Sequence, residues 1–84
     1  MDKMSNHKKL IEIFVSTLGI KESLIIDSLE YNTIAQWDSV AHMTLIAGLE
    51  EEFGIMFNTD DIINMSSVAK VKQILAKHGV DFLD

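Results

Sequence analysis

Two serines in this sequence stand where a hydroxyl group could be chemically modified. Each follows an aspartate and precedes an aliphatic residue, in Asp27-Ser28-Leu29 and in Asp38-Ser39-Val40. Such a triplet is typical of an ordinary helix start, where the aspartate caps free backbone N–H groups. It can also present the serine to a modifying enzyme, because a helix N-terminus favours an added negative charge. The residues that follow each serine decide between the two.

Capping alone does not distinguish the serines, because Asp27 and Asp38 could each cap a helix. Ser28 leads into 31–34, which is poor in helix formers and has no apolar period, so two turns are the most it could start. Ser39 leads into fifteen residues with a clear helical stripe, made of His42, Leu45, Ile46, Leu49 and Phe53. A phosphate ester on Ser39 would lie beside free N–H groups and the positive end of that helix. We therefore expect Ser39 to be the functional serine.

The apolar spacing predicts an all-α fold, a small four-helix bundle with three longer helices. These helices are expected over 6–18, over 39–53 and from 68 to the region of His78, where Gly79 stops the last one. A short third helix, capped by Asn58 or Thr59, is expected from Asp60 to about Met65, and Ser67 is expected to cap the last helix. The segment 20–37 has no sustained period, which predicts a long loop with about one helical turn between the first two helices.

Length and composition limit what the chain can be. Its 84 residues predict one domain over 1–84, and a domain of this size has little room for a deep substrate pocket. The absence of Cys excludes disulfides and thiolate chemistry by the chain itself. A net charge of −6 argues against nucleic acid as a partner. Without an evident signal peptide or membrane span, we expect a cytoplasmic monomer with no membrane partner.

The charges are unevenly distributed along the chain. No Lys or Arg lies between Glu22 and Ala69, whereas nine of the thirteen acidic residues do. A solvated acidic surface is the plain interpretation, and a docking face for basic partners is the sharper one. The second interpretation gains from Glu50, Glu51 and Glu52, which lie at a helix C-terminus where the helix dipole disfavours acids.

The segment from Asp38 to Ile55, D-S-V-A-H-M-T-L-I-A-G-L-E-E-E-F-G-I, resembles the second helix of acyl carrier proteins. The similarity continues through F-N-T-D-D-I to S-S-V-A-K-V, so it covers nearly the whole chain. The resemblance implies that Ser39 is esterified with 4′-phosphopantetheine from coenzyme A by a phosphopantetheinyl transferase. The thiol of that arm would carry an acyl or aminoacyl group as a thioester to acyl-activating, acyl-transferring or condensing enzymes. The protein would then be a carrier and not an enzyme.

The resemblance also implies a docking surface for basic patches on those enzymes. By position, its residues are Asp38, Val40, Met43, Ala47, Glu50, Glu51 and Phe57. Val40, Ala41 and Thr44 depart from the pattern of fatty-acid-synthesis carriers, as do Trp37 and His42. The combination W-D-S-x-x-H is more similar to free-standing carriers of specialised pathways.

Three other interpretations compete with a carrier. Ser39 and His42, three residues apart, could suggest a hydrolase, but no nucleophile elbow or oxyanion loop is present. The acidic segment from Asn58 lacks the Gly and Glu of a calcium loop, so no metal site is expected. An unmodified acidic adaptor for basic proteins stays open as the alternative.

We expect Trp37 and His42, at the N′ and N4 positions around Asp38, to pack together as a staple.

Overall fold

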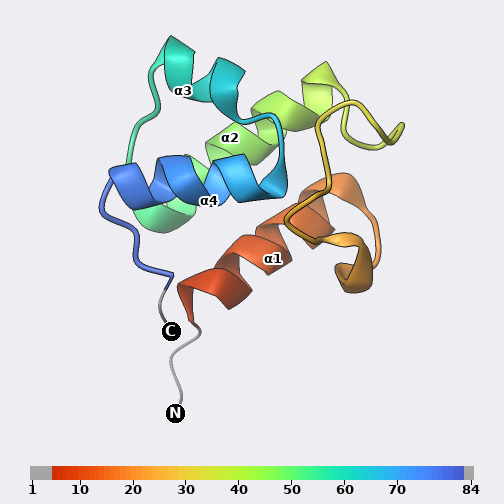
Figure 1. The fold of residues 1–84 in the computed structure, drawn as a ribbon, viewed down its shortest axis with the longest axis horizontal. Coiled ribbons are helices and arrows are strands. Elements are labelled where there is room, and N and C mark those ends of the chain that lie inside the picture. The colour runs from red at the N-terminus through yellow and green to blue at the C-terminus, as the bar shows by residue number, and fades with distance from the viewer. Residues whose placement is uncertain (1–4, 83–84) are drawn as a thin grey trace.

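The two long helices begin and end at residues that satisfy their free backbone groups. The computed structural model describes residues 5–82 (Figure 1). Helix α1 spans Asn6–Leu18 and α2 spans Ser39–Phe53, as predicted. Ser5 caps α1 by accepting a hydrogen bond from the Lys8 N–H at 3.0 Å. Each helix ends at a glycine in the left-handed conformation, a backbone geometry that costs a residue with a side chain about 1–2 kcal/mol.

The short third helix is displaced by one residue from its expected position. Helix α3 spans Thr59–Asn64 because Asn58, and not Thr59, takes the capping role. The Asn58 side chain accepts from the Asp61 N–H at 2.7 Å, and the Asp61 carboxylate accepts from the Asn58 N–H at 3.4 Å. This reciprocal pair is a capping box, which fixes where the helix starts. Helix α4 spans Val68–Lys77 and is capped by Ser67, as expected.

The long loop between α1 and α2 is fastened to the start of α4. It contains a single turn of 3₁₀ helix, η1, at Glu22–Leu24. Further on, the backbone N–H of Tyr31 donates to the Ser66 carbonyl at 2.9 Å, and that of Val68 donates to the Leu29 carbonyl at 3.0 Å. Figure 1 shows this part of the loop running beside the first turn of α4. These bonds give a segment without helical period a defined path.

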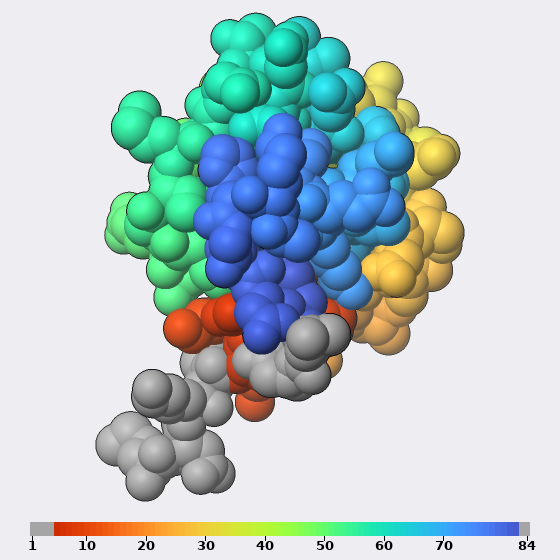
Figure 2. Space-filling model, turned by 60° about the vertical axis from the view of Figure 1, so that its left-hand side comes forward, coloured from red at the N-terminus to blue at the C-terminus, as the bar shows by residue number. Residues whose placement is uncertain are grey.

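The core lies where α1, α2 and α4 meet, with the loop closing one side. Trp37 and Phe14 are fully buried, and their rings meet edge to face with centroids 5.3 Å apart. Full burial of one large apolar side chain contributes roughly 1.5–3 kcal/mol. Gly48 of α2 faces Ile13 of α1, and a methyl group there would lie 3.4 Å from the Ile13 side chain, which is an ordinary contact distance. Figure 2 shows α4 across one face of the molecule with α3 above it.

Over residues 5–82 the architecture is the predicted all-α bundle of three longer helices and one short one. Phe53 is half-buried, so the buried stripe of α2 consists of its other four predicted members. Within 5–82, no helix is both long enough and apolar enough to cross a membrane.

Candidate functional site

Ser39 is the first residue of α2 and is exposed. Asp38 before it is the N-cap, and its Oδ1 accepts from the Ala41 N–H at 2.8 Å. The Asp38 carbonyl accepts the first helical hydrogen bond, from the His42 N–H at 2.8 Å. Within the described part of the chain, the Ser39 hydroxyl makes no hydrogen bond. Its oxygen is therefore accessible and lies at the positive end of a fifteen-residue helix.

A shallow apolar hollow runs from Ser39 along the outer side of α2. Its volume is about 640 Å³, and Ser39, Val40, Met43, Thr44 and Ala47 line it. Val40 is 75% exposed and Met43 is 53% exposed, although both are large apolar side chains. The structure thus brings together four of the expected site residues (Ser39, Val40, Met43 and Ala47) on one open face, and Asp38 directly precedes it.

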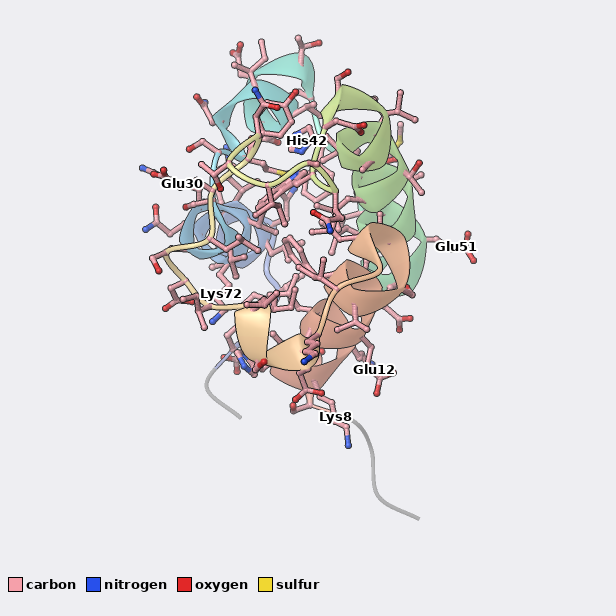
Figure 3. The ribbon with its side chains drawn as sticks, turned by 90° about the vertical axis from the view of Figure 1, so that its right-hand side faces the viewer. Lys8, Glu12, Glu30, His42, Glu51 and Lys72 are labelled. Atoms are coloured by element: carbon pink, nitrogen blue, oxygen red, sulfur yellow. The ribbon has the colours of Figure 1, made fainter. Side chains whose placement is uncertain are left out.

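The three glutamates at the end of α2 have three different environments. Glu50 is half-buried, and its Oε2 accepts from the Phe57 N–H at 2.9 Å, which fixes the turn after the helix. Glu52 lies 4.0 Å from the ammonium group of Lys9. Glu51 is exposed, points away from the molecule and has no ion pair or hydrogen bond within 5–82 (Figure 3). Structural contacts therefore account for two glutamates, and Glu51 is the one free to meet a partner.

Phe57, expected on the docking surface, lies elsewhere. It is only 8% exposed, and its ring packs edge-on against His78 with centroids 5.4 Å apart. A single apolar residue in a loop does not reveal from sequence whether it points inward, and here the hydrogen bond to Glu50 turns it into the core. We correct that expectation: Phe57 is part of the buried core and contributes little to the surface.

Ser28 has none of the features of Ser39 except exposure. It lies in a turn that leads into the loop, and no helix starts there. Its neighbour Asp27 is engaged by Lys72 of α4, whose Nζ donates to Oδ1 at 2.7 Å. Asp27, in the first Asp-Ser pair, therefore helps to fasten the loop to α4.

Trp37 and His42 pack together as expected and also share a hydrogen bond that their spacing did not reveal. The Trp37 Nε1–H donates to His42 Nδ1 at 3.0 Å, and the two rings lie 29° from parallel. The other ring nitrogen of His42, Nε2, lies 3.0 Å from the Ile62 carbonyl of α3. With both nitrogens occupied, His42 is not a base for Ser39, so no hydrolase dyad exists at this site.

A buried ionic cluster at the other end of α3 was missed from the sequence. Asp61 is 1% exposed, and its two oxygens accept from Lys77 Nζ at 2.6 Å and His78 Nε2 at 2.8 Å. The hydrogen bond from Lys77, followed by that from His78, lowers the pKa of Asp61 from 3.8 to about 2. The cluster lies around α3 and α4 and serves to hold them together.

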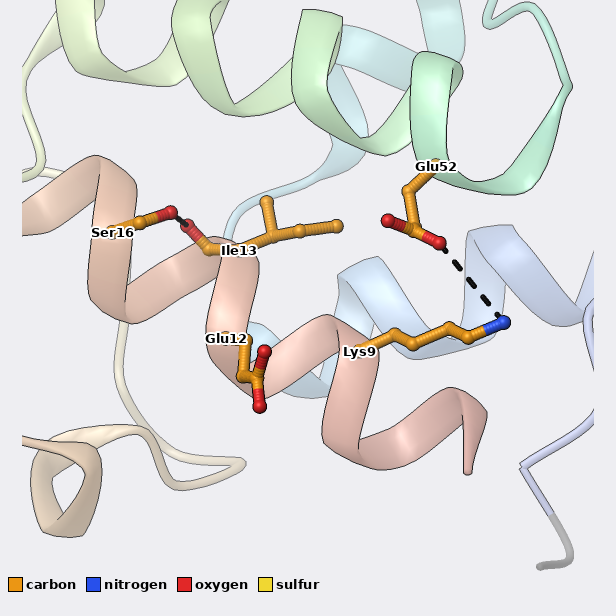
Figure 4. Close-up of a pocket in the computed structure, with 5 residues that line it drawn as sticks. All are labelled: Lys9, Glu12, Ile13, Ser16 and Glu52. Atoms are coloured by element: carbon orange, nitrogen blue, oxygen red, sulfur yellow. Dashed lines mark hydrogen bonds and ion pairs between the residues drawn. The ribbon is translucent and has the colours of Figure 1, made fainter. Parts of the chain in front are cut away.

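A second hollow, on the α1 side, has no functional geometry. Lys9, Glu12, Ile13, Ser16 and Glu52 line it (Figure 4). Lys9 faces Glu52, and the Ser16 hydroxyl donates to the Ile13 carbonyl in its own helix at 3.2 Å. No group of three or more metal-ligating side chains occurs in the described residues. Lys9, Glu52 and Ser16 are thus paired locally and do not converge on a ligand.

The chain is similar in sequence to a curated protein. No protein-family model matches the chain. A curated protein of Mycoplasma genitalium, named acyl carrier protein homolog, is 38% identical over 47 residues. The match covers 51% of this chain and 56% of that protein, so the chain spans about half the length of this curated relative. The similarity supports an acyl-carrier-like chain, and a carrier more than a catalyst.

Proposed function

We propose that this protein carries an acyl or aminoacyl group as a thioester on a 4′-phosphopantetheine arm attached to Ser39. We further propose that 1–84 form a single carrier domain that delivers this group to biosynthetic enzymes. The observation that carries the proposal is the unbonded, exposed hydroxyl of Ser39 at the capped start of α2. The similarity to a protein named acyl carrier protein homolog supports it independently.

The residues present fit such a group. Ser39 Oγ is free to form the ester, and the N–H groups at the start of α2 favour the phosphate charge. Asp38 has one oxygen committed to the Ala41 N–H, so the cap and the modified serine do not compete for the same donor. When bound, 4′-phosphopantetheine supplies a thiol that holds the acyl group, and the chain itself has no Cys that could do so.

The same face is proposed to meet the partner enzymes. The first would be a phosphopantetheinyl transferase, followed by acyl-activating, acyl-transferring or condensing enzymes with basic docking patches. Val40, Met43 and Ala47 provide an apolar centre, and Glu51 provides an exposed charge beside it. Charges at the rim of an interface mainly raise the association rate and exclude wrong partners.

Intact-mass measurement tests the proposal directly. Incubation with coenzyme A and a broad-specificity phosphopantetheinyl transferase should add one phosphopantetheinyl group to the wild-type protein. Ser39→Ala should abolish this gain while helical circular dichroism stays unchanged, and Ser28→Ala is the matched control that should keep it. A phosphopantetheinyl fragment found on a peptide that contains Ser28 would refute the assignment.

The second candidate function is an unmodified acidic adaptor that binds basic proteins. The exposure of Val40 and Met43 favours it, because an apolar face serves docking whether or not Ser39 is modified. An adaptor would show no mass gain with coenzyme A, and Ser39→Ala would bind basic partners as the wild type does. Modification of Ser39 in the assay above would exclude it.

A further inference from the structure

Trp37 and His42, whose side chains share a hydrogen bond, flank Ser39 in the sequence. Trp37 lies two residues before Ser39 and His42 lies three residues after it. The bond between their side chains therefore joins the end of the loop to the first turn of α2. Trp37 is completely buried and His42 is 8% exposed, so water does not compete for this bond.

The direction of this bond determines what His42 does with its other nitrogen. The indole of Trp37 is a donor only, so Nδ1 of His42 accepts. The neutral ring then has its proton on Nε2, which donates to the Ile62 carbonyl at 3.0 Å. That carbonyl belongs to the last turn of α3 and also accepts from the Met65 N–H at 3.4 Å, so the His42 bond adds a second donor to it. One imidazole thus connects the loop, α2 and α3 (Figure 3).

Contacts around the ring limit its movement. The Tyr31 ring lies 4.9 Å from the His42 ring, and the Tyr31 N–H is bonded to the Ser66 carbonyl beyond α3. The Asn32 N–H donates to the Trp37 carbonyl at 2.9 Å. The loop segment 30–37 is therefore held by one hydrogen bond within itself, from Asn32 to Trp37, and by another to the segment after α3. Neither the Trp37 indole nor the His42 imidazole can rotate away without breaking the buried hydrogen bond between them.

We propose that Trp37 and His42 are positioning residues for the modification of Ser39. Their hydrogen bond, continued to the Ile62 carbonyl, holds the first turn of α2 in one position relative to α3. Ser39 and the apolar hollow are then presented to the transferase as one rigid surface. This inference rests on the proposed function, because it concerns how readily Ser39 is recognised.

Loss of this hydrogen bond should change the KM of the transferase and not its kcat. If the first turn of α2 is ordered only part of the time, the apparent affinity falls by the competent fraction. The turnover of molecules that do bind is unchanged. His42→Leu, which replaces the imidazole by an apolar side chain of similar size, and Trp37→Phe, which removes the N–H donor and part of the buried ring, should therefore raise the transferase KM. We expect an increase of about three- to tenfold with kcat nearly constant. The double variant should be no worse than the more affected single variant, because both remove the same connection.

The test combines transferase kinetics with amide hydrogen exchange. The N–H groups of Ala41 and His42, which bond to Asp38, should exchange faster in both variants while α4 keeps its protection. Val71→Ala, which opens a cavity at a fully buried position in α4, is the stability control and should leave the KM unchanged. An unchanged KM in His42→Leu and Trp37→Phe, or an equal rise in Val71→Ala, would overturn the positioning role. A raised KM without faster exchange at Ala41 and His42 would overturn it too. A wild-type protein that gains no mass would instead refute the proposed function, and the positioning role with it.

Discussion

The carboxylate of Asp61 in α3 lies 2.6 Å from the ammonium group of Lys77 at the end of α4. Together with His78, Lys77 keeps the carboxylate ionised although it is buried, and its pKa falls from 3.8 to about 2. A group with a lowered folded-state pKa stabilises the fold fully above its unfolded pKa. That contribution is lost as the pH falls through the folded value.

Asp61→Asn should therefore change how stability depends on acid. Between about pH 5 and about pH 2 the wild-type protein should lose more stability than the variant, because in this range the unfolded wild type binds a proton on Asp61 that the folded protein does not bind. At neutral pH the variant should be the less stable of the two. Urea unfolding across this pH range measures both effects. Parallel pH profiles of the two proteins would show that the ion pair contributes no acid sensitivity.

Glu51→Lys should slow the modification of Ser39 through charge. At low salt we expect kcat/KM of the transferase to fall by roughly two- to fivefold, mainly through KM, because the exposed rim charge aids association. The effect should shrink towards physiological ionic strength, where charges are screened beyond about 8 Å. Glu12→Lys on α1 is the matched control, an exposed acid with the same change in net charge (Figure 3). Equal effects of the two reversals would mean that only net charge matters.

Met43→Asp should damage docking by a different route. It puts a charge into the apolar hollow beside Ser39, where a bound partner would have to desolvate it. We expect a loss in kcat/KM of the transferase of about tenfold or more that salt does not relieve. Met56→Asp is the control, since Met56 is 83% exposed and lies outside the hollow. Similar losses in both variants, or a loss that disappears with salt, would argue against an apolar docking centre.

Two glycines should respond in opposite ways to the same substitution. Gly48→Ala should stabilise the protein by about 0.5–1 kcal/mol, because alanine favours a helix interior and the new methyl meets Ile13 at ordinary contact distance. Gly54→Ala should destabilise it by about 1–2 kcal/mol, because that residue adopts a φ of 63°. Urea midpoints of the two variants test both signs. A destabilising Gly48→Ala would mean that α1 and α2 cannot accommodate one methyl group.

Local features of the sequence were enough to place α1 and α2 at their observed bounds. Each has an unbroken apolar stripe, a side-chain cap and a terminal glycine, and all of these act within one helix. For α3 the sequence left two capping residues open, and the choice of Asn58 depended on its reciprocal bonds with Asp61. Of the proposed site, Val40, Met43 and Ala47 were expected on the docking surface from the resemblance to acyl carrier proteins, and in the structure they line one hollow together with Ser39.

Contacts between distant parts of the chain could not be predicted in this way. Asp61 has the sequence signature of an ordinary first-turn acid, and only the packing of α4 brings Lys77 and His78 to it. The contact between Trp37 and His42 was predictable from their spacing, but the bond from His42 to Ile62 required the position of α3. The burial of Phe57 was missed for the same reason, since its hydrogen bond to Glu50 forms only across the turn between them.

The fastening of the long loop to α4 has a consequence for the order in which the chain folds. The bonds from Tyr31 to Ser66 and from Val68 to Leu29 join segments far apart in the sequence, so a large loop must close before either can form. Helices form within microseconds, whereas such distant pairings are slow. Trp37, which is buried where this loop meets the core, should reach its native fluorescence later than the helices reach their native circular dichroism. Simultaneous signals in a stopped-flow refolding experiment would show instead that loop and helices are consolidated in one step.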